Sequence, residues 1–184
     1  MLFRQFVDDD LGCASYLIGD EDSGEAVVVD PAYAIEDYLE QAERDGVRIV
    51  RVLETHTHAD HVSGHGRLAL EHGLPISIHP AADPAYPFDP LEDGRTIELG
   101  QVAIRVLHTP GHRPEHCCFE VIDREKEMVR LGSGGLDGKK LTQEAMSSTL
   151  QALSKFVRLA QSHQVDEMLA ALVGLTHLDA GRRR

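Results

Sequence analysis

Ligand-type side chains crowd into "THTHADH", residues 55–61, directly after the apolar run "VRIVRVLE". His56 and His58 are two residues apart just past a predicted strand, so both side chains can point to one side. Asp60 and His61 follow on the turn. Imidazole nitrogens suit zinc and iron, and a carboxylate makes a site harder. Four ligand-type residues in six positions therefore predict a metal site.

A second segment, "HTPGH" at residues 108–112, offers a partner for this cluster. It follows the predicted strand "VAIRVLHT", and its Pro-Gly pair is typical of a tight turn. Such a turn would carry His112 to the same edge of the fold as the first cluster. We therefore expect His112 to join the metal site.

Composition excludes several classes of partner. The net charge of −13 argues against nucleic acid and anionic membranes, because binding phosphates requires cationic patches. No run approaches the roughly 18 apolar residues of a membrane span. Three cysteines without a CxxC pattern indicate a reducing compartment, and "MLFRQFVDDD" turns acidic too early for a signal peptide. We expect a cytoplasmic protein.

Strand and helix patterns alternate along residues 1–122. "ASYLIGD" and "EAVVVDP" are typical of a β-hairpin, and "AIEDYLEQAERDG" has the apolar spacing of a helix. "VRIVRVLET" and "PISIH" are predicted strands with the short helix "GRLALEHG" between them. Three further strands follow in "RTIELG", "VAIRVLHT" and "CCFEVID". This order predicts a layered α/β fold.

The same motifs resemble a known family. "THTHADH" matches the HxHxDH signature of the metallo-β-lactamase superfamily, and "HTPGH" is similar to its third-ligand motif. The resemblance covers about residues 1–122 and implies a metallo-β-lactamase-like layered αβ sandwich, truncated and completed by a C-terminal helical segment. "ETHTHADHVSG" resembles the persulfide dioxygenase branch more than the glyoxalase II branch, whose residue at the position of Ala59 is usually bulkier.

The resemblance also implies roles for individual residues. His56, His58 and His112 would form one metal site, and Asp60 and His61 would belong to a second, with Asp60 as the candidate catalytic residue. The implied cofactor is zinc or iron. The implied substrate is a small-molecule thiol or thioester of the glutathione type. Asp30, at the end of "VVVDP", would hydrogen-bond around the metal loop without binding the metal.

One departure from the family pattern leaves the activity open. Ser133 stands where the family has an aspartate that bridges two metals or binds one iron. Asp137 could replace it, and His177 could be a further ligand. Three readings follow: a persulfide dioxygenase-like protein, impaired or inactive if the carboxylate is missing; a glyoxalase II-like zinc thioester hydrolase; or a metal-binding chain without turnover.

The sequence changes character near Asp123. Residues 1–122 hold 23 Asp and Glu against 8 Lys and Arg, whereas residues 123–184 hold 8 against 10. Residues 123–172 resemble an internal segment of the exopolyphosphatase/guanosine-pentaphosphate phosphatase family, without its phosphate-binding motif. We expect a chimera of a metal-binding part, 1–122, and a strand-helix segment, 123–184, packed as one domain. A helix at 142–162 would cover the sheet or pair with a second copy as a homodimer.

Overall fold

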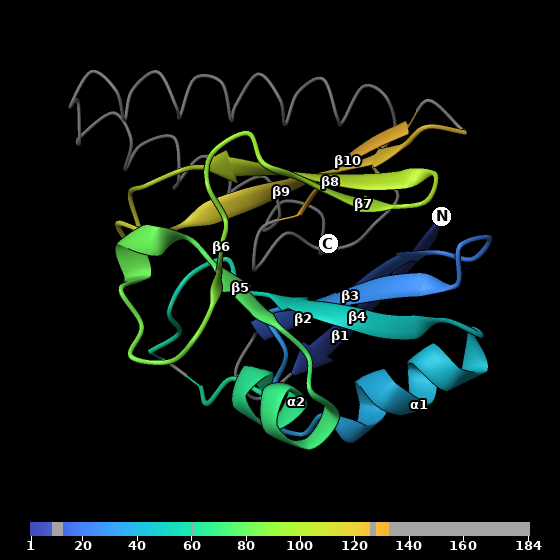
Figure 1. Cartoon of the computed structure of the whole chain (residues 1–184), viewed down its shortest axis with the longest axis horizontal. Coiled ribbons are helices and arrows are strands. Elements are labelled where there is room, and N and C mark those ends of the chain that lie inside the picture. Colours follow the sequence, from blue (N-terminus) through green and yellow to red (C-terminus); the bar gives the residue numbers. More distant parts are fainter. Residues whose placement is uncertain (9–12, 60, 126–127, 133–184) are drawn as a thin grey trace, which may run out of the picture. The chain divides into compact units, whose positions relative to one another are not determined.

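Two β-sheets face each other in the computed structural model, which describes residues 1–8, 13–59, 61–125 and 128–132 (Figure 1). Two helices cover the outer face of the larger sheet. This arrangement confirms the layered αβ sandwich predicted from the sequence. The helix expected at 142–162 and the homodimer that it could form fall outside the described residues.

The larger sheet has six strands in the order β1-β2-β3-β4-β5-β6. The first three strands are antiparallel neighbours, and from β3 onward the neighbours run parallel. Its strands are β1 (Leu2–Asp8), β2 (Cys13–Asp20), β3 (Glu25–Val29), β4 (Arg48–Leu53), β5 (Ile76–Ile78) and β6 (Asp89–Pro90). Parallel strands need crossovers, which α1 (Glu36–Arg44) and α2 (His65–His72) supply.

The smaller sheet is antiparallel throughout, in the order β10-β9-β8-β7. Its strands are β7 (Thr96–Leu99), β8 (Val102–His108), β9 (Cys117–Asp123) and β10 (Met128–Gly132). A short 3-10 helix, Pro80–Ala82, follows β5. β10 pairs with β9 from Met128↔Asp123 to Gly132↔Phe119, so this pairing spans the predicted change of origin near Asp123. That change of origin stays a prediction.

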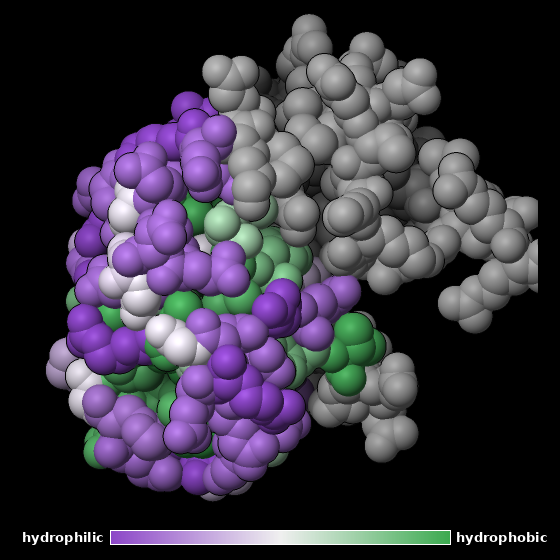
Figure 2. Space-filling view, turned by 90° about the vertical axis from the view of Figure 1, so that its right-hand side faces the viewer, coloured by the Kyte–Doolittle hydropathy of each residue, from purple (hydrophilic) through white to green (hydrophobic). Residues whose placement is uncertain are grey.

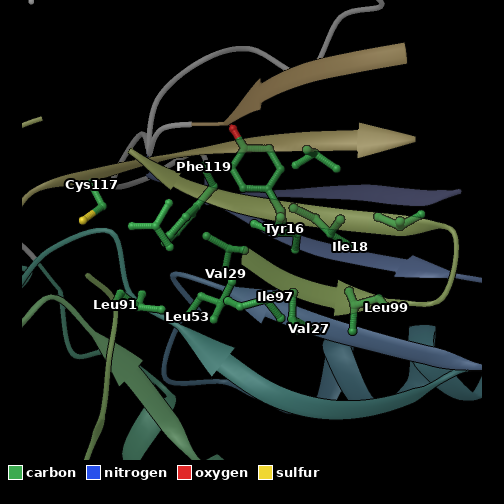
Figure 3. Packing of buried hydrophobic residues seen from close by; sticks show 14 residues of the cluster. Tyr16, Ile18, Val27, Val29, Leu53, Leu91, Ile97, Leu99, Cys117 and Phe119 are labelled. Carbon is green, nitrogen blue, oxygen red and sulfur yellow. The ribbon is translucent and has the colours of Figure 1, made fainter. Parts of the chain in front are cut away.

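The main core lies between the two sheets (Figure 3). Every second residue of β8 and β9 points inward, and Val106 and Phe119 are 0% and 1% exposed. On the facing sheet Val27 and Val29 join this core, whereas Val28 packs on the opposite face beneath the helices. The larger sheet is therefore buried on both faces, which explains the near-continuous apolar run of β3.

The face shown in Figure 2 is mainly hydrophilic, with apolar side chains between the polar ones. Four large hydrophobic side chains are exposed among the described residues: Val7, Tyr33, Val62 and Leu70. In that same part of the chain no helix is long and apolar enough to cross a membrane.

Most of the predicted elements are confirmed. The predicted hairpin is β2 and β3, and the predicted strands and helices of residues 34–123 correspond to α1, β4, α2, β5, β7, β8 and β9. β1 was not predicted, because "LFRQFVD" lacks strict alternation of apolar and polar residues. The strand is defined by its full antiparallel register with β2, from Leu2↔Gly19 to Asp8↔Cys13.

A close backbone contact fixes the segment after β3 against the start of α2. The N–H of Gly64 donates to the carbonyl oxygen of Pro31 at 2.8 Å. A Cβ atom on Gly64 would lie 2.2 Å from the carbonyl oxygen of Ala32 and 2.8 Å from the Cγ2 of Ile35. Only glycine allows this approach. The contact therefore fixes the segment that follows β3 relative to the segment that precedes α2.

This contact generates a test of stability with an internal control. We expect Gly64→Ala to lower the free energy of unfolding by about 1–3 kcal/mol, because backbone must move to admit the methyl group. Gly66→Ala is the control, because its new Cβ would meet nothing within 4 Å. Alanine favours a helix more than glycine does, so we expect the free energy of unfolding to stay equal or to rise by up to about 1 kcal/mol. Urea unfolding measures both, and equal losses would contradict the contact.

Candidate metal centre

The centre forms at the carboxyl ends of two parallel strands. β3 and β4 are paired so that Val29 lies opposite Leu53, and the next residues, Asp30 and Glu54, therefore leave the sheet side by side. Asp30 N–H donates to the carbonyl oxygen of Leu53 at 2.9 Å. Both carboxylates are buried, at 3% and 1% exposure. Buried carboxylates need hydrogen-bond donors, and the histidine loop supplies them.

Asp30 holds His56 through the hydroxyl group of Thr55. The N–H and hydroxyl groups of Thr55 donate to the two carboxylate oxygens of Asp30, each at 2.7 Å. The hydroxyl proton is used in this bond, so Thr55 Oγ1 accepts from His56 Nδ1 at 2.8 Å. The proton on Nδ1 leaves Nε2 as the nitrogen of His56 that can bind a metal.

His58 is held through its other ring nitrogen. Its Nε2 lies 3.2 Å from Asp30 Oδ1 and 3.4 Å from Glu54 Oε2. One ligand atom from each of these three residues lies within 4.8 Å of the others, which is also compatible with an ion. Because the nitrogen faces two carboxylates that already accept other bonds, we interpret the group as support, which leaves Nδ1 of His58 for the metal.

The second loop comes from the smaller sheet. Residues 109–116 form a turn closed by the Thr109 N–H, which donates to the carbonyl oxygen of His116 at 2.8 Å. The N–H of Cys117 donates to the carbonyl oxygen of Thr55 at 2.8 Å, which joins this turn to the histidine loop. The ring centroid of His112 lies 4.9 Å from that of His56. The turn therefore delivers His112 as its sequence pattern predicts.

The structure gathers four of the five predicted ligands. The ring centroids of His56 and His58 are 4.2 Å apart, and those of His58 and His61 are 4.4 Å apart. Asp60 lies outside the described residues, as do the alternatives at positions 133, 137 and 177. The imidazoles and their hydrogen-bond partners fit zinc or iron, because both metals accept histidine nitrogens held in this way.

Opposite pKa shifts distinguish the two histidines at the strand end. Burial, followed by the neighbouring histidines His58, His116 and His112, lowers the pKa of His56 to about 4. Burial would also lower the pKa of His58, but hydrogen bonds to Asp30 and Glu54 outweigh it and raise that pKa to about 10. His56 is therefore neutral at pH 7, whereas metal binding at His58 releases a proton.

Three residues near this centre were not predicted from the sequence. Glu54 accepts from Ser63 Oγ at 2.6 Å and lies 3.0 Å from His65 Nδ1, so it supports the start of α2 as well as His58. Glu115 and His116 lie in the second loop. The position of Glu54 after a parallel strand, beside Asp30, could have indicated its role, whereas no local signal identified the other two.

Glu115 joins the two ligand loops. It is 2% exposed, and its Oε1 accepts from Thr57 N–H at 3.1 Å, from the Thr57 hydroxyl group and from Arg113 Nε at 3.1 Å. Arg113 Nη2 also donates to Thr57 Oγ1 at 2.8 Å. Thr57 lies between His56 and His58, and Arg113 follows His112, so one carboxylate fixes both ligand segments.

A cavity of about 760 Å³ opens beside the centre. Its walls include His56, His58 and His61 together with Tyr33, Tyr86 and Leu70. This size lies within the usual range for a small-molecule site, and the mixed apolar and polar lining is typical of one. The histidines therefore face a space that can hold a substrate.

The hydrogen bonds of Asp30 predict an effect on metal affinity. We expect Asp30→Asn to weaken zinc binding by about 10–100-fold. Asparagine replaces one of the two carboxylate oxygens by an NH2 group, so the side chain can no longer serve both Thr55 and His58. Asp83→Asn is the matched control, since Asp83 shares the left-handed backbone (φ 46° against 47°). Competition with a chelator measures both affinities, and equal values would refute the role of Asp30.

The bonds of Glu115 predict a graded effect on stability. Glu115→Ala should lower the free energy of unfolding by about 1–3 kcal/mol, because the partly buried N–H and hydroxyl groups of Thr57 lose their acceptor. Glu115→Gln keeps an oxygen at the position of Oε1 and should cost less. Denaturant unfolding of both variants is the measurement, and an equal loss would show that these accepted bonds contribute little.

Comparisons with known proteins agree with this geometry. The sequence profile described as the metallo-beta-lactamase superfamily matches residues 8–125. The bovine mitochondrial persulfide dioxygenase ETHE1 is 34% identical over 131 residues, covering 67% of this chain and 49% of that protein. A hydroxyacylglutathione hydrolase from Maricaulis maris is 30% identical over 179 residues, covering 91% of this chain and 68% of that protein.

A solved structure extends the likeness to a metal-loaded protein. A structure described as a di-iron-bound form superposes with a TM-score of 0.55 at 27% identity, covering 82% of this chain and 85% of that chain. The chain spans about half the length of the first curated relatives that it matches, between 41% and 57%. On the matched profile and the relatives together, the chain belongs to the metallo-β-lactamase superfamily.

Proposed function

We propose that the chain is a metal-dependent enzyme that acts on the sulfur of a glutathione-type substrate, as a persulfide dioxygenase with iron. The observation that carries this proposal is the meeting of His56, His58 and His112 from two loops, with the remote nitrogen of His56 held by a hydrogen bond and that of His58 held beside the carboxylate of Asp30. The 34% identity to a persulfide dioxygenase supports the reaction class.

The residues of the chain would bind and orient, and the metal would carry the reaction. His56, His58 and His112 would hold it, with Asp60 and His61 as proposed ligands of a second position and Asp60 as the proposed catalytic carboxylate. When bound, iron supplies redox chemistry at sulfur and zinc supplies Lewis acidity. The cavity of about 760 Å³ beside the histidines would receive the substrate.

One observation favours a second candidate, thioester hydrolysis with zinc. The hydroxyacylglutathione hydrolase relative aligns with 91% of this chain, a larger share than the 67% aligned with the persulfide dioxygenase. Both candidates would act on the same class of glutathione-linked substrate. They differ in the metal and in whether oxygen is consumed.

The experiment compares the two reactions on protein of known metal content. Elemental analysis should find zinc or iron bound to the purified chain, and less than about 0.2 metal ions per chain would remove the metal proposal. Oxygen uptake with glutathione persulfide tests the first reaction, and hydrolysis of S-lactoylglutathione tests the second. We expect oxygen uptake that is abolished in His56→Ala.

The control separates an enzyme from a chain that only binds metal. If both rates equal those of His56→Ala while wild-type protein holds a metal, the centre binds metal without turnover. If only the thioester is consumed, the zinc hydrolase is the function. The proposals that two sequences of different origin meet near Asp123 and that the chain forms a homodimer are independent of this outcome.

A further inference from the structure

Exposed apolar side chains gather at the cavity beside the centre. The described part of the chain exposes four large hydrophobic side chains, and three of them line this cavity: Tyr33, Val62 and Leu70. The fourth, Val7, lies in β1 and is not part of the cavity wall. Single exposed apolar residues are common on protein surfaces, but three at one cavity of about 760 Å³ indicate a surface that a ligand covers.

The apolar surface continues into the cavity through less exposed residues. Ile78, the last residue of β5, is 1% exposed, and the nearby Pro84 and Tyr86 follow the 3-10 helix. The ring of Tyr86 lies 5.2 Å from that of His65, tilted by 40°. We call the six apolar residues together the apolar wall: Tyr33, Val62, Leu70, Ile78, Pro84 and Tyr86.

Polar side chains that line the same cavity are paired with one another. Ser63 Oγ donates to Glu54 Oε1 at 2.6 Å, and His65 Nδ1 lies 3.0 Å from the same oxygen. Arg67 donates from Nε to Glu71 Oε1 at 2.8 Å and from Nη2 to Glu71 Oε2 at 3.1 Å. These groups already use hydrogen-bonding capacity within the protein, so the apolar wall is the surface that gains most from a ligand.

The charge at the cavity disfavours an anionic ligand group. Arg67 is the one arginine or lysine among the described residues that line the cavity, and its Nη2 also donates to Glu36 Oε1 at 2.9 Å. The bonds to Arg67 lower the pKa of both Glu36 and Glu71, so both are ionised at neutral pH. Two carboxylates therefore surround one guanidinium, which leaves no positive charge for a substrate carboxylate.

We propose that the cavity binds an apolar organic group bonded to the reacting sulfur of the substrate. In a glutathione thioester this group is the acyl chain, aliphatic or aromatic. The inference rests on the proposed function and narrows its substrate class. His56 and His58 line the same cavity as the apolar wall, so a sulfur held at the centre has its substituent within the cavity. A small or polar substituent would leave the apolar wall in water.

Two glutathione thioethers that differ only in the apolar group test the inference. S-Hexylglutathione and S-methylglutathione share their other contacts, including any with the metal, so the ratio of their affinities reports the contribution of the apolar group. We expect the metal-loaded chain to bind the hexyl compound about 10-fold more tightly or better, because each fully buried methylene contributes about 4-fold. Isothermal titration calorimetry measures both affinities, and equal values would overturn the inference.

Paired variants locate the effect. Leu70→Gln combined with Val62→Thr makes two exposed residues of the apolar wall polar at nearly constant size, and we expect the preference for the hexyl compound to fall by about 5-fold or more. Val7→Thr is the matched control, because Val7 and Val62 are 57% and 69% exposed and only Val62 lines the cavity. The control should keep the wild-type ratio. An unchanged ratio in the double variant, or the same loss in the control, would contradict the assignment.

A measurement on the wild-type chain covers the case in which the double variant does not fold. The methyl resonances of Leu70 should shift when the hexyl compound is added and stay in place with the methyl compound; unshifted resonances would overturn the inference. So would a wild-type dimer that the double variant abolishes while both compounds bind equally, because the apolar wall would then cover a second copy of the chain.

Measuring binding without turnover separates this inference from the proposed function. A chain that prefers the hexyl compound but catalyses neither reaction contradicts the proposed function alone. An active chain that binds the two compounds equally contradicts this inference alone.

Discussion

The carboxylate of Asp30 is the interaction on which the rest of the centre depends. It lies at the end of a parallel strand in a left-handed conformation (φ 47°), accepts from the backbone and hydroxyl group of Thr55, and lies 3.2 Å from Nε2 of His58 in an ion pair. One buried group thus sets the path of the loop, the tautomer of His56 and the orientation of His58. Burial raises the pKa of Asp30, and the bond from His58 opposes that rise.

The second requirement is that loops from two different sheets meet. Sheet packing brings β9 and β4 together through their apolar faces, and the bond between Cys117 and Thr55 then fixes the register between the loops. Glu115 adds a buried charge that both loops contact. Such a charge is costly to bury, and its bonds to Thr57 and Arg113 offset that cost only when the two loops lie in this relative position.

The sequence identified the candidate ligands but not the residues that support them. HxHxDH places histidines at short spacing, so His56 and His58 could be identified locally, and the Pro-Gly turn indicated His112. Glu54 supports His58 and His65, up to 11 positions away, whereas Glu115 and His116 contact a loop from the other sheet, up to 60 positions away, as in the pair His56 and His116. Local periodicity carries no information about such contacts.

The same limit applies to the fold. The apolar runs predicted β3, β4 and β8, because buried strands have strong local patterns. They did not predict β1, whose place depends on pairing with β2 rather than on its own alternation. Sheet order, which puts β4 between β3 and β5, also follows from crossover geometry and not from any residue pattern.

Because loops from both sheets meet at the centre, a bound ion would also stabilise the fold. His56 follows a strand of the larger sheet and His112 follows a strand of the smaller one, so an ion held by both would be a cross-link through the sandwich. Opening the sandwich would then require release of the ion, and its binding energy would oppose that opening. Cellular metal supply would in this way set how long the folded chain resists proteolysis, separately from any catalysis.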